Sequence, residues 1–208
     1  MIVNLSLLSV FIPTFFMVSL TPGLCMTLSM VLGMTLGVRR ALWMMIGELV
    51  GVGLVAVAAG AGVATLMLRQ PLAFAAFKWL GGAYLVYLGV MMWRSRGRMA
   101  IPSEPAAVRD VSRWQLISQG FVTAVANPKG WAFFIALLPP FLDTDLPLAP
   151  QLAVLVGMIL TLELCSLLLY ATGGRTASHL LAKSGNVRLL NRLAGTLMVG
   201  VGVWLALG

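Results

Sequence analysis

Charged residues are scarce in this sequence, and so are the residues that hold metals or cross-link small secreted domains. Only 10% of the 208 residues are charged, against about 25% in soluble domains, so a soluble globular enzyme is not expected. One histidine and two cysteines exclude a disulfide scaffold and leave no credible metal-ligand cluster. No Lys or Arg precedes Arg39, so the first apolar segment lacks the positive region of a signal peptide, and we interpret it as a true span.

Hydrophobic residues, in contrast, are abundant. They make up 60% of the chain, and because a transmembrane helix needs ~20 of them in a row, the supply suffices for roughly six spans. Six stretches fit: 4–31, 41–67, 71–93, 115–142, 149–173 and 190–207. The sequence therefore predicts an all-α membrane protein with six transmembrane helices, embedded in a lipid bilayer.

The few basic residues are distributed unevenly between the two predicted sides of the membrane. Eleven of the fourteen lie in or beside the connections between spans one and two, three and four, and five and six: Arg39, Arg40, Arg94, Arg96, Arg98, Arg109, Arg113, Arg175, Lys183, Arg188 and Arg192. The positive-inside rule places these connections in the cytoplasm and both termini outside it. Topology and anionic headgroups thus explain the net charge of +8, and no nucleic-acid partner is expected.

The two halves of the chain resemble each other. Pro22 interrupts the first span and Pro128 the fourth, 106 residues apart, while Glu48 and Glu163, 115 residues apart, are the only acidic residues inside spans. Three spans per half is an odd number, so the halves lie in the membrane with opposite orientation. Inverted repeats with broken helices in corresponding positions indicate a secondary transporter. The predicted organisation is a single domain, 1–208, with repeat one at 1–93, a cytoplasmic connector at 94–114 and repeat two at 115–208.

Each predicted helix break is a candidate substrate site. Proline removes a backbone donor, and inside a membrane the freed groups need protein or a wet cavity to satisfy them. A half-helix that starts after such a break offers free N–H groups and a positive dipole end to a carboxylate. The alternative is a proline kink used only for packing. The candidate substrate-binding residues are Thr21, Pro22, Gly23, Asn127, Pro128 and Lys129.

Three charged residues lie inside the predicted spans, where a charge is costly and marks a function by default. We hypothesise that Glu48 or Glu163 carries a proton in one state and binds the substrate ammonium, or pairs with Lys129, in another. The alternative is a structural bond that fixes helix packing. Lys129 could hold the substrate carboxylate, neutralise a glutamate or cap carbonyls freed by Pro128.

Two tyrosines are further candidates, whereas catalytic motifs are missing from the sequence. Tyr84 and Tyr87 lie three residues apart on one face of the third span, where they could line a pathway or pack between helices. The sequence has no Gly-x-Ser-x-Gly motif, and its only histidine lies in a predicted loop. We therefore expect no catalytic residues, no enzyme activity, no metal site and no cofactor.

Short motifs spread over nearly the whole chain resemble the LysE/RhtB family of amino-acid exporters. They are Ser19-Leu20-Thr21-Pro22-Gly23, Gly37-Val38-Arg39-Arg40-Ala41, the run from Lys78 to Gly89, Gln119-Gly120-Phe121 with Asn127-Pro128-Lys129 and Phe133-Phe134, and the spacing of Arg192, Gly195 and Gly202. The family's first motif usually continues with Pro and Asn, where this chain has Leu24 and Cys25.

The resemblance implies a multi-pass protein of the bacterial cytoplasmic (inner) membrane. It also implies export of amino acids or close analogues from the cytoplasm, driven by the membrane potential or proton gradient. Composition and spacing alone reach only a small inverted-repeat secondary transporter, so an exporter of cations, metals or other small solutes with the same architecture stays open. The small size and the glycine-lined faces allow a homodimer.

Overall fold

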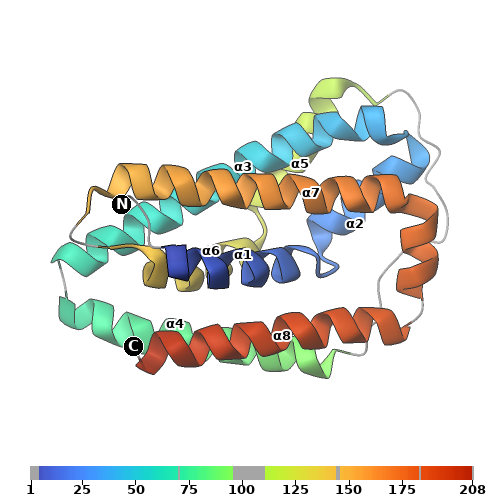
Figure 1. Cartoon of the computed structure of the whole chain (residues 1–208). Helices are drawn as coiled ribbons and strands as arrows, with labels where there is room; N and C mark the ends of the chain where they lie inside the picture. The colour runs from blue at the N-terminus through green and yellow to red at the C-terminus, as the bar shows by residue number, and fades with distance from the viewer. Residues whose placement is uncertain (1–4, 70, 96–110, 144–145, 183, 208) are drawn as a thin grey trace.

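The described part of the chain consists of helices (Figure 1). The structure, a computed structural model, describes residues 5–69, 71–95, 111–143, 146–182 and 184–207. The helices of the first half are α1 (Leu5–Ser19), α2 (Leu24–Thr35), α3 (Val38–Arg69) and α4 (Pro71–Arg94). Those of the second half are α5 (Arg113–Val125), α6 (Pro128–Leu137), the short 3₁₀ helix η1 (Pro139–Phe141), α7 (Leu148–Ala182) and α8 (Ser184–Leu207). The all-α prediction is confirmed for these residues.

Helix breaks lie at both predicted positions. α1 ends at Ser19 and α2 begins at Leu24, and the two helix axes differ by 59° across this break. α5 ends at Val125 and α6 begins at Pro128, so Ala126 and Asn127 separate them. Proline explains both positions, because it cannot donate to the preceding turn and restricts the residue before it to an extended backbone.

The described residues contain fewer clear spans than the sequence predicts. Two helical segments, Val38–Thr65 and Leu148–Gly174, are long and apolar enough to cross a membrane. The bent pair Ser9–Ser19 and Leu24–Thr35 qualifies as a third span if the two pieces are counted together. The described parts of α4, α5, α6 and α8 do not meet that criterion, so the six-span arrangement stays a prediction.

Glycine lets three helix pairs approach closely: α4 with α8, α3 with α5, and α2 with α7. In the antiparallel α4–α8 pair, which lies along one edge of the molecule in Figure 1, Gly82 meets Gly202 and Gly89 meets Gly195. A Cβ atom built on Gly195 would lie 2.5 Å from the Gly89 carbonyl oxygen, so only glycine fits at this position. Small residues that allow such backbone contact are typical of helix packing in membranes.

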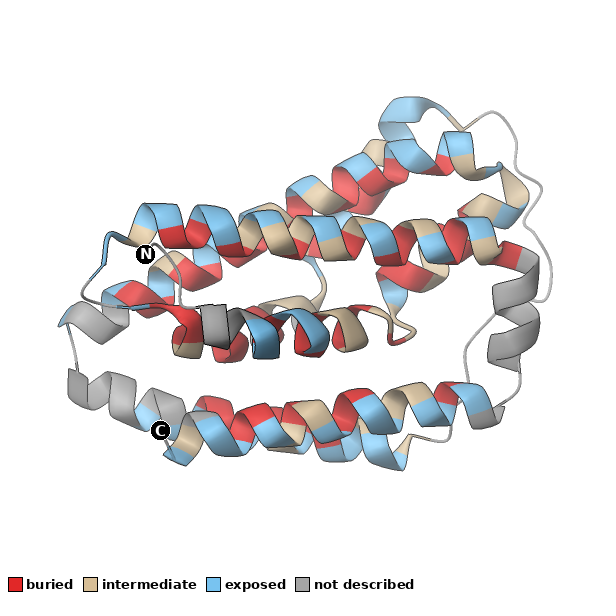
Figure 2. Cartoon of the chain, viewed as in Figure 1, coloured by how far each residue is buried: buried red, intermediate tan, exposed pale blue. Residues whose placement is uncertain are grey.

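The core has an aromatic end and a methionine-rich end, and both face the interior (Figure 2). The aromatic end joins α1, α6 and η1 through Phe11, Phe15, Phe133, Phe134 and Phe141. The other end joins α2, α3, α5 and α7 through Met26, Met30, Met44, Met45, Leu116 and Leu167. Between these ends the two helix breaks leave a space that neither cluster fills.

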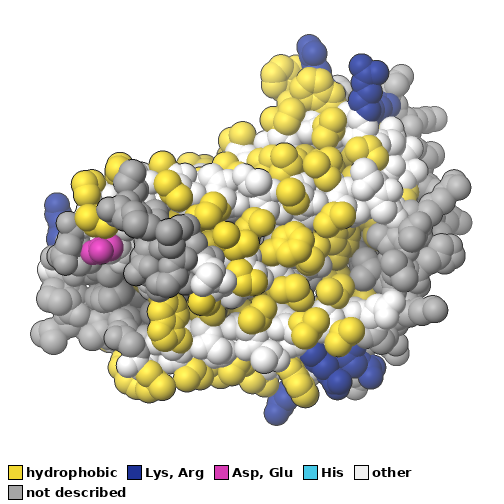
Figure 3. All heavy atoms as spheres, in the orientation of Figure 1, with side chains coloured by type: hydrophobic (Ala, Val, Ile, Leu, Met, Phe, Trp, Pro, Cys, Tyr) yellow, Lys and Arg dark blue, Asp and Glu magenta, His cyan; other side chains and the backbone are white. Residues whose placement is uncertain are grey.

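The outer surface matches a membrane environment. Hydrophobic side chains cover the middle of the face in Figure 3, and most of its Lys and Arg side chains lie toward one end. Exposed apolar residues on the long helices include Val50, Leu54 and Leu169, each more than half exposed. Such contiguous exposed apolar surface is unusual for a soluble monomer and fits contact with lipid.

Candidate functional site

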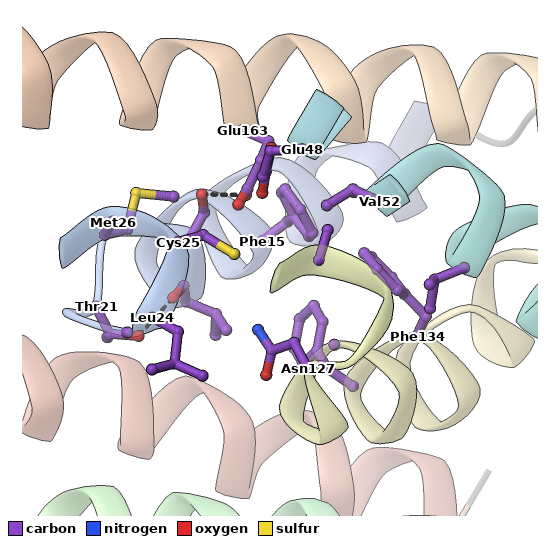
Figure 4. Close-up of a pocket in the computed structure, with 17 residues that line it drawn as sticks. Phe15, Thr21, Leu24, Cys25, Met26, Glu48, Val52, Asn127, Phe134 and Glu163 are labelled. Atoms are coloured by element: carbon purple, nitrogen blue, oxygen red, sulfur yellow. Dashed lines mark hydrogen bonds between the residues drawn. The ribbon is translucent and has the colours of Figure 1, made fainter. Parts of the chain in front are cut away.

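A cavity of about 300 Å³ lies where the two helix breaks meet (Figure 4). It is enclosed by the end of α1, the start of α2, the middle of α3 and of α7, the end of α5, and α6. Its lining residues are Phe15, Val18, Ser19, Thr21, Gly23, Leu24, Cys25, Met26, Glu48, Val52, Val55, Ala124, Asn127, Gly130, Phe133, Phe134 and Glu163. Both halves of the chain therefore contribute to a single site.

The two acidic residues of the predicted spans lie next to each other at one end of this cavity (Figure 4). Glu48 is fully buried, and its carboxyl group lies beside that of Glu163 and the Cys25 thiol. Glu163 is 9% exposed, and its Oε2 atom accepts a hydrogen bond of 2.5 Å from the Ser19 hydroxyl. Two adjacent carboxylates in a desolvated site repel each other, so this end of the cavity favours a proton or a cation.

The break between α1 and α2 exposes a helix N-terminus to the cavity. Gly23 precedes α2 in an extended conformation (φ −142°, ψ −173°), and no side chain caps the helix. The first residues of α2, Leu24, Cys25 and Met26, line the cavity. An uncapped helix N-terminus presents backbone N–H donors and partial positive charge, which together suit a carboxylate.

Carbonyl groups released at this break are satisfied from within the protein. The Thr21 hydroxyl donates to the Val18 carbonyl oxygen (2.5 Å), and the Tyr170 hydroxyl of α7 donates to the Leu20 carbonyl oxygen (2.8 Å). Tyr170 is buried. The break is thus held in place by a neighbouring helix, as a membrane interior requires.

Replacing Tyr170 by Phe should destabilise the protein, because the Leu20 carbonyl oxygen loses this donor. A buried polar group without a partner costs about 1–3 kcal/mol, so we expect the thermal midpoint of the purified protein to fall by roughly 2–10 °C. The matched control is Tyr87→Phe, at a side chain that is 60% exposed. Equal midpoints for the two variants would show that the hydrogen bond contributes nothing to stability.

The second break is held in a related way. The Asn127 carbonyl oxygen accepts hydrogen bonds from the backbone N–H groups of Gly130 (3.1 Å) and Trp131 (3.4 Å). The indole N–H of Trp131 donates to the Val125 carbonyl oxygen at 2.9 Å. An aromatic side chain with a polar group therefore satisfies one carbonyl at each break.

The predicted site residues divide into three groups. Five of them line the cavity together: Thr21, Gly23, Glu48, Asn127 and Glu163. Pro22 forms the first break without lining the cavity, and the side chains of Pro128 and Lys129 lie outside those that the structure describes. Tyr84 and Tyr87 do not reach this cavity but lie on α4, 39% and 60% exposed, with ring centroids 6.2 Å apart.

The cavity also contains residues that sequence reasoning did not assign to the site, chiefly Ser19, Cys25, Phe15, Val52 and Val55. The sequence does contain a signal that could have placed the two valines in the site. Val52 and Val55 follow Glu48 by four and seven residues, which places all three on one face of a helix. The Cys25 thiol lies close to Glu48. Across the described residues, no three His, Cys, Asp or Glu side chains are grouped in a way that could hold a metal ion.

Comparisons with known proteins agree with the transporter prediction. The sequence model of the family described as LysE type translocator matches residues 16–208. A homoserine/homoserine lactone efflux protein of Salmonella typhimurium is 30% identical over 190 residues, which cover 91% of each chain. A leucine efflux protein of Enterobacter sp. is 27% identical over 200 residues, 92% of this chain and 90% of the relative. An uncharacterized membrane protein of Vibrio cholerae is 29% identical over 188 residues, 90% of each chain. No solved structure matches the chain.

Proposed function

Because the chain belongs to the LysE type translocator family, we propose that it exports an amino acid or a close analogue from the bacterial cytoplasm by secondary active transport. The family and the names of the relatives indicate a transporter rather than an enzyme. The observation that carries the proposal is the cavity at the two helix breaks, which joins an acidic end to an uncapped helix N-terminus.

The cavity offers complementary groups for both charges of an amino acid. The substrate ammonium binds between Glu48 and Glu163, where a cation offsets the repulsion between the carboxylates. The substrate carboxylate binds at the first turn of α2, beyond Gly23. Asn127 faces the same space from the second break. Pro22, Pro128 and Lys129 remain predicted members of the binding site, with Lys129 as a second partner for the carboxylate.

We propose that the chain crosses the bacterial inner membrane six times, as two inverted repeats of three spans. In this arrangement α1–α2 and α5–α6 each form one broken span, and α3, α4, α7 and α8 form the others. Both termini lie outside the cytoplasm. The arginines near the α2–α3 turn, the end of α4 and the start of α5 support this orientation, since they lie on the predicted cytoplasmic side.

Proton coupling follows from the same acidic pair. When the cavity is open to the outside, a proton replaces the substrate ammonium at Glu48 or Glu163, and it is released on the cytoplasmic side before the next substrate binds. The two charges compete for one place, so proton entry and amino-acid exit are linked. Glu48 is fully buried beside Glu163 and the Cys25 thiol, so a proton or a substrate ammonium can offset the charge of this pair.

Export from whole cells tests the proposal. Cells loaded with dipeptides of labelled amino acids should release at least one amino acid severalfold faster when they make the protein, and an uncoupler should remove the difference. Cells carrying the empty vector serve as the control. Unchanged release of every amino acid, together with altered tolerance of metal cations, would instead favour a cation exporter of the same architecture.

A further inference from the structure

The polarity and size of the side chains that line the cavity indicate which substrate side chain fits. Resting on the function proposed above, we infer that the exported amino acid has an uncharged, apolar side chain in the size range from valine to phenylalanine, and that Phe15, Val52, Val55 and Phe133 select it. Polar and apolar groups are ordered along the cavity in a way that distinguishes such a side chain from a charged one.

Helix α3 sets this order along one wall. Glu48, Val52 and Val55 lie on the same face and all line the cavity. At 1.5 Å per residue, Val55 lies about 10 Å further along the helix than Glu48. Val55 is 1% exposed and Val52 is 8% exposed. The wall therefore changes from a carboxyl group to the branched apolar side chain of Val52 within about 6 Å, roughly the length of one amino acid, and Val55 continues the apolar wall.

Helix α1 shows a similar order, and α6 adds aromatic side chains to the apolar end. On α1 the hydroxyl of Ser19 binds Glu163, while Phe15, one turn earlier, belongs to the apolar end. The Phe15 ring lies 5.8 Å from that of Phe133 and 6.1 Å from that of Phe134. These three phenylalanines are at most 4% exposed. A substrate with its ammonium at the acidic end thus directs its side chain toward aromatic rings and valines.

Among the described lining residues, the polar side chains other than the two glutamates belong to the helix breaks and their flanks, not to the valine and phenylalanine walls: Ser19, Thr21, Cys25 and Asn127. The hydroxyl of Ser19 is used by Glu163, and that of Thr21 by the Val18 carbonyl oxygen. A charged side chain would lose its hydration against Phe and Val, which is far more costly than burying an apolar group. A hydroxyl is rejected less strongly, since apolar pockets discriminate against it by only about 100-fold.

The size of the cavity limits the substrate to a single small molecule. A volume of about 300 Å³ is at the lower end of the range of ligand pockets, ~300–1,000 Å³. A volume of this size accommodates one amino acid rather than an elongated peptide. Leucine, isoleucine, methionine and phenylalanine have the required combination of ammonium and apolar side chain.

Competition in reconstituted vesicles tests the inference. Vesicles containing the full-length protein are loaded with labelled leucine and one unlabelled competitor: phenylalanine, methionine, homoserine, lysine or glutamate. Phenylalanine and methionine should reduce leucine efflux at concentrations about 10- to 100-fold lower than homoserine, and lysine and glutamate should compete still less. Preference for homoserine or lysine would overturn the inference but leave amino-acid export intact, whereas transport of no amino acid would overturn both.

A matched pair of variants locates the selectivity in the cavity wall. Val55→Thr keeps the shape of the side chain and adds one hydroxyl at the apolar end, so the leucine-to-homoserine ratio should fall about tenfold. Val57→Thr, two residues further along α3 and 46% exposed, should leave the ratio unchanged. Because a ratio does not depend on how much protein folds, reduced yield cannot imitate the effect. Equal ratios in the two variants would overturn the role of Val55.

Discussion

Replacing Glu48 by Gln is expected to lower amino-acid export by about 100-fold, and Glu163→Gln should have a similar effect. Glutamine has the shape of glutamate but carries no negative charge, so it neither attracts the substrate ammonium nor exchanges a proton with it. Removal of one partner from a buried charge pair costs ~2–5 kcal/mol, and 1.4 kcal/mol corresponds to a factor of ten. Export of labelled amino acid from dipeptide-loaded cells, with and without an uncoupler, measures the loss.

Both variants should still fold, which separates this prediction from a general loss of structure. At position 48 the amide of Gln keeps the size and shape of the carboxyl group and can still bond the neighbouring Cys25 and Glu163 side chains. At position 163 the amide oxygen of Gln can still accept the Ser19 hydroxyl. The control is Asp143→Asn, at an exposed carboxyl group outside the cavity. Full, uncoupler-sensitive export by the double variant Glu48→Gln/Glu163→Gln would contradict the assigned role.

The second large effect is expected on stability, from Gly47→Val. Gly47 is the point where α3 lies directly on α5: a Cβ atom built there would be 1.9 Å from the Ile117 carbonyl oxygen and 2.9 Å from its Cα atom. The obstacle is backbone, so no side-chain rotation can relieve it and the two helices must separate. Overpacking commonly costs ~1–3 kcal/mol, and we expect this variant to reach or exceed that upper value. Its thermal midpoint and its yield of monodisperse protein should both fall.

The same helix supplies the control. Gly62 also lies on α3, and a Cβ atom at this position meets nothing within 4 Å. Gly62→Val therefore imposes the same change in helix propensity without the collision. If Gly47→Val and Gly62→Val were equally stable, the close packing of α3 on α5 would not be the feature that holds these helices together.

The sequence predicts the helix breaks well because their cause is local. A proline lacks the N–H group wherever it occurs, although Pro13 stays inside α1. At Pro22 and Pro128 the adjoining Gly23 and Asn127 also favour turns, so the two interruptions follow from neighbouring residues in the sequence. The two glutamates were also identifiable without a structure, since a carboxyl group in an apolar segment is costly wherever the helix packs. The two glutamates and the residues beside these prolines, Thr21, Gly23 and Asn127, are the predicted residues that line the cavity.

Which face of each helix points into the protein could not be predicted in the same way. The apolar residues of α4 are not concentrated on one face, so periodicity does not tell which side faces the protein and which faces lipid. Tyr84 and Tyr87 were therefore candidates for the pathway, although the structure has them on the exposed side of α4. Phe15 and Cys25 belong to the cavity only because the bend between α1 and α2 directs both toward α3 and α6, which is a property of the tertiary structure.

The pairing of α4 with α8 has a mechanical consequence. These helices come from opposite halves of the chain, pack through reciprocal glycine contacts, and contribute no described residue to the cavity. A carrier that opens alternately to two compartments needs one part that stays still and another that tilts against it. We expect the α4–α8 pair to act as a static scaffold. The helices around Glu48 and Glu163 would then tilt against it and expose the amino acid first to one compartment and then to the other.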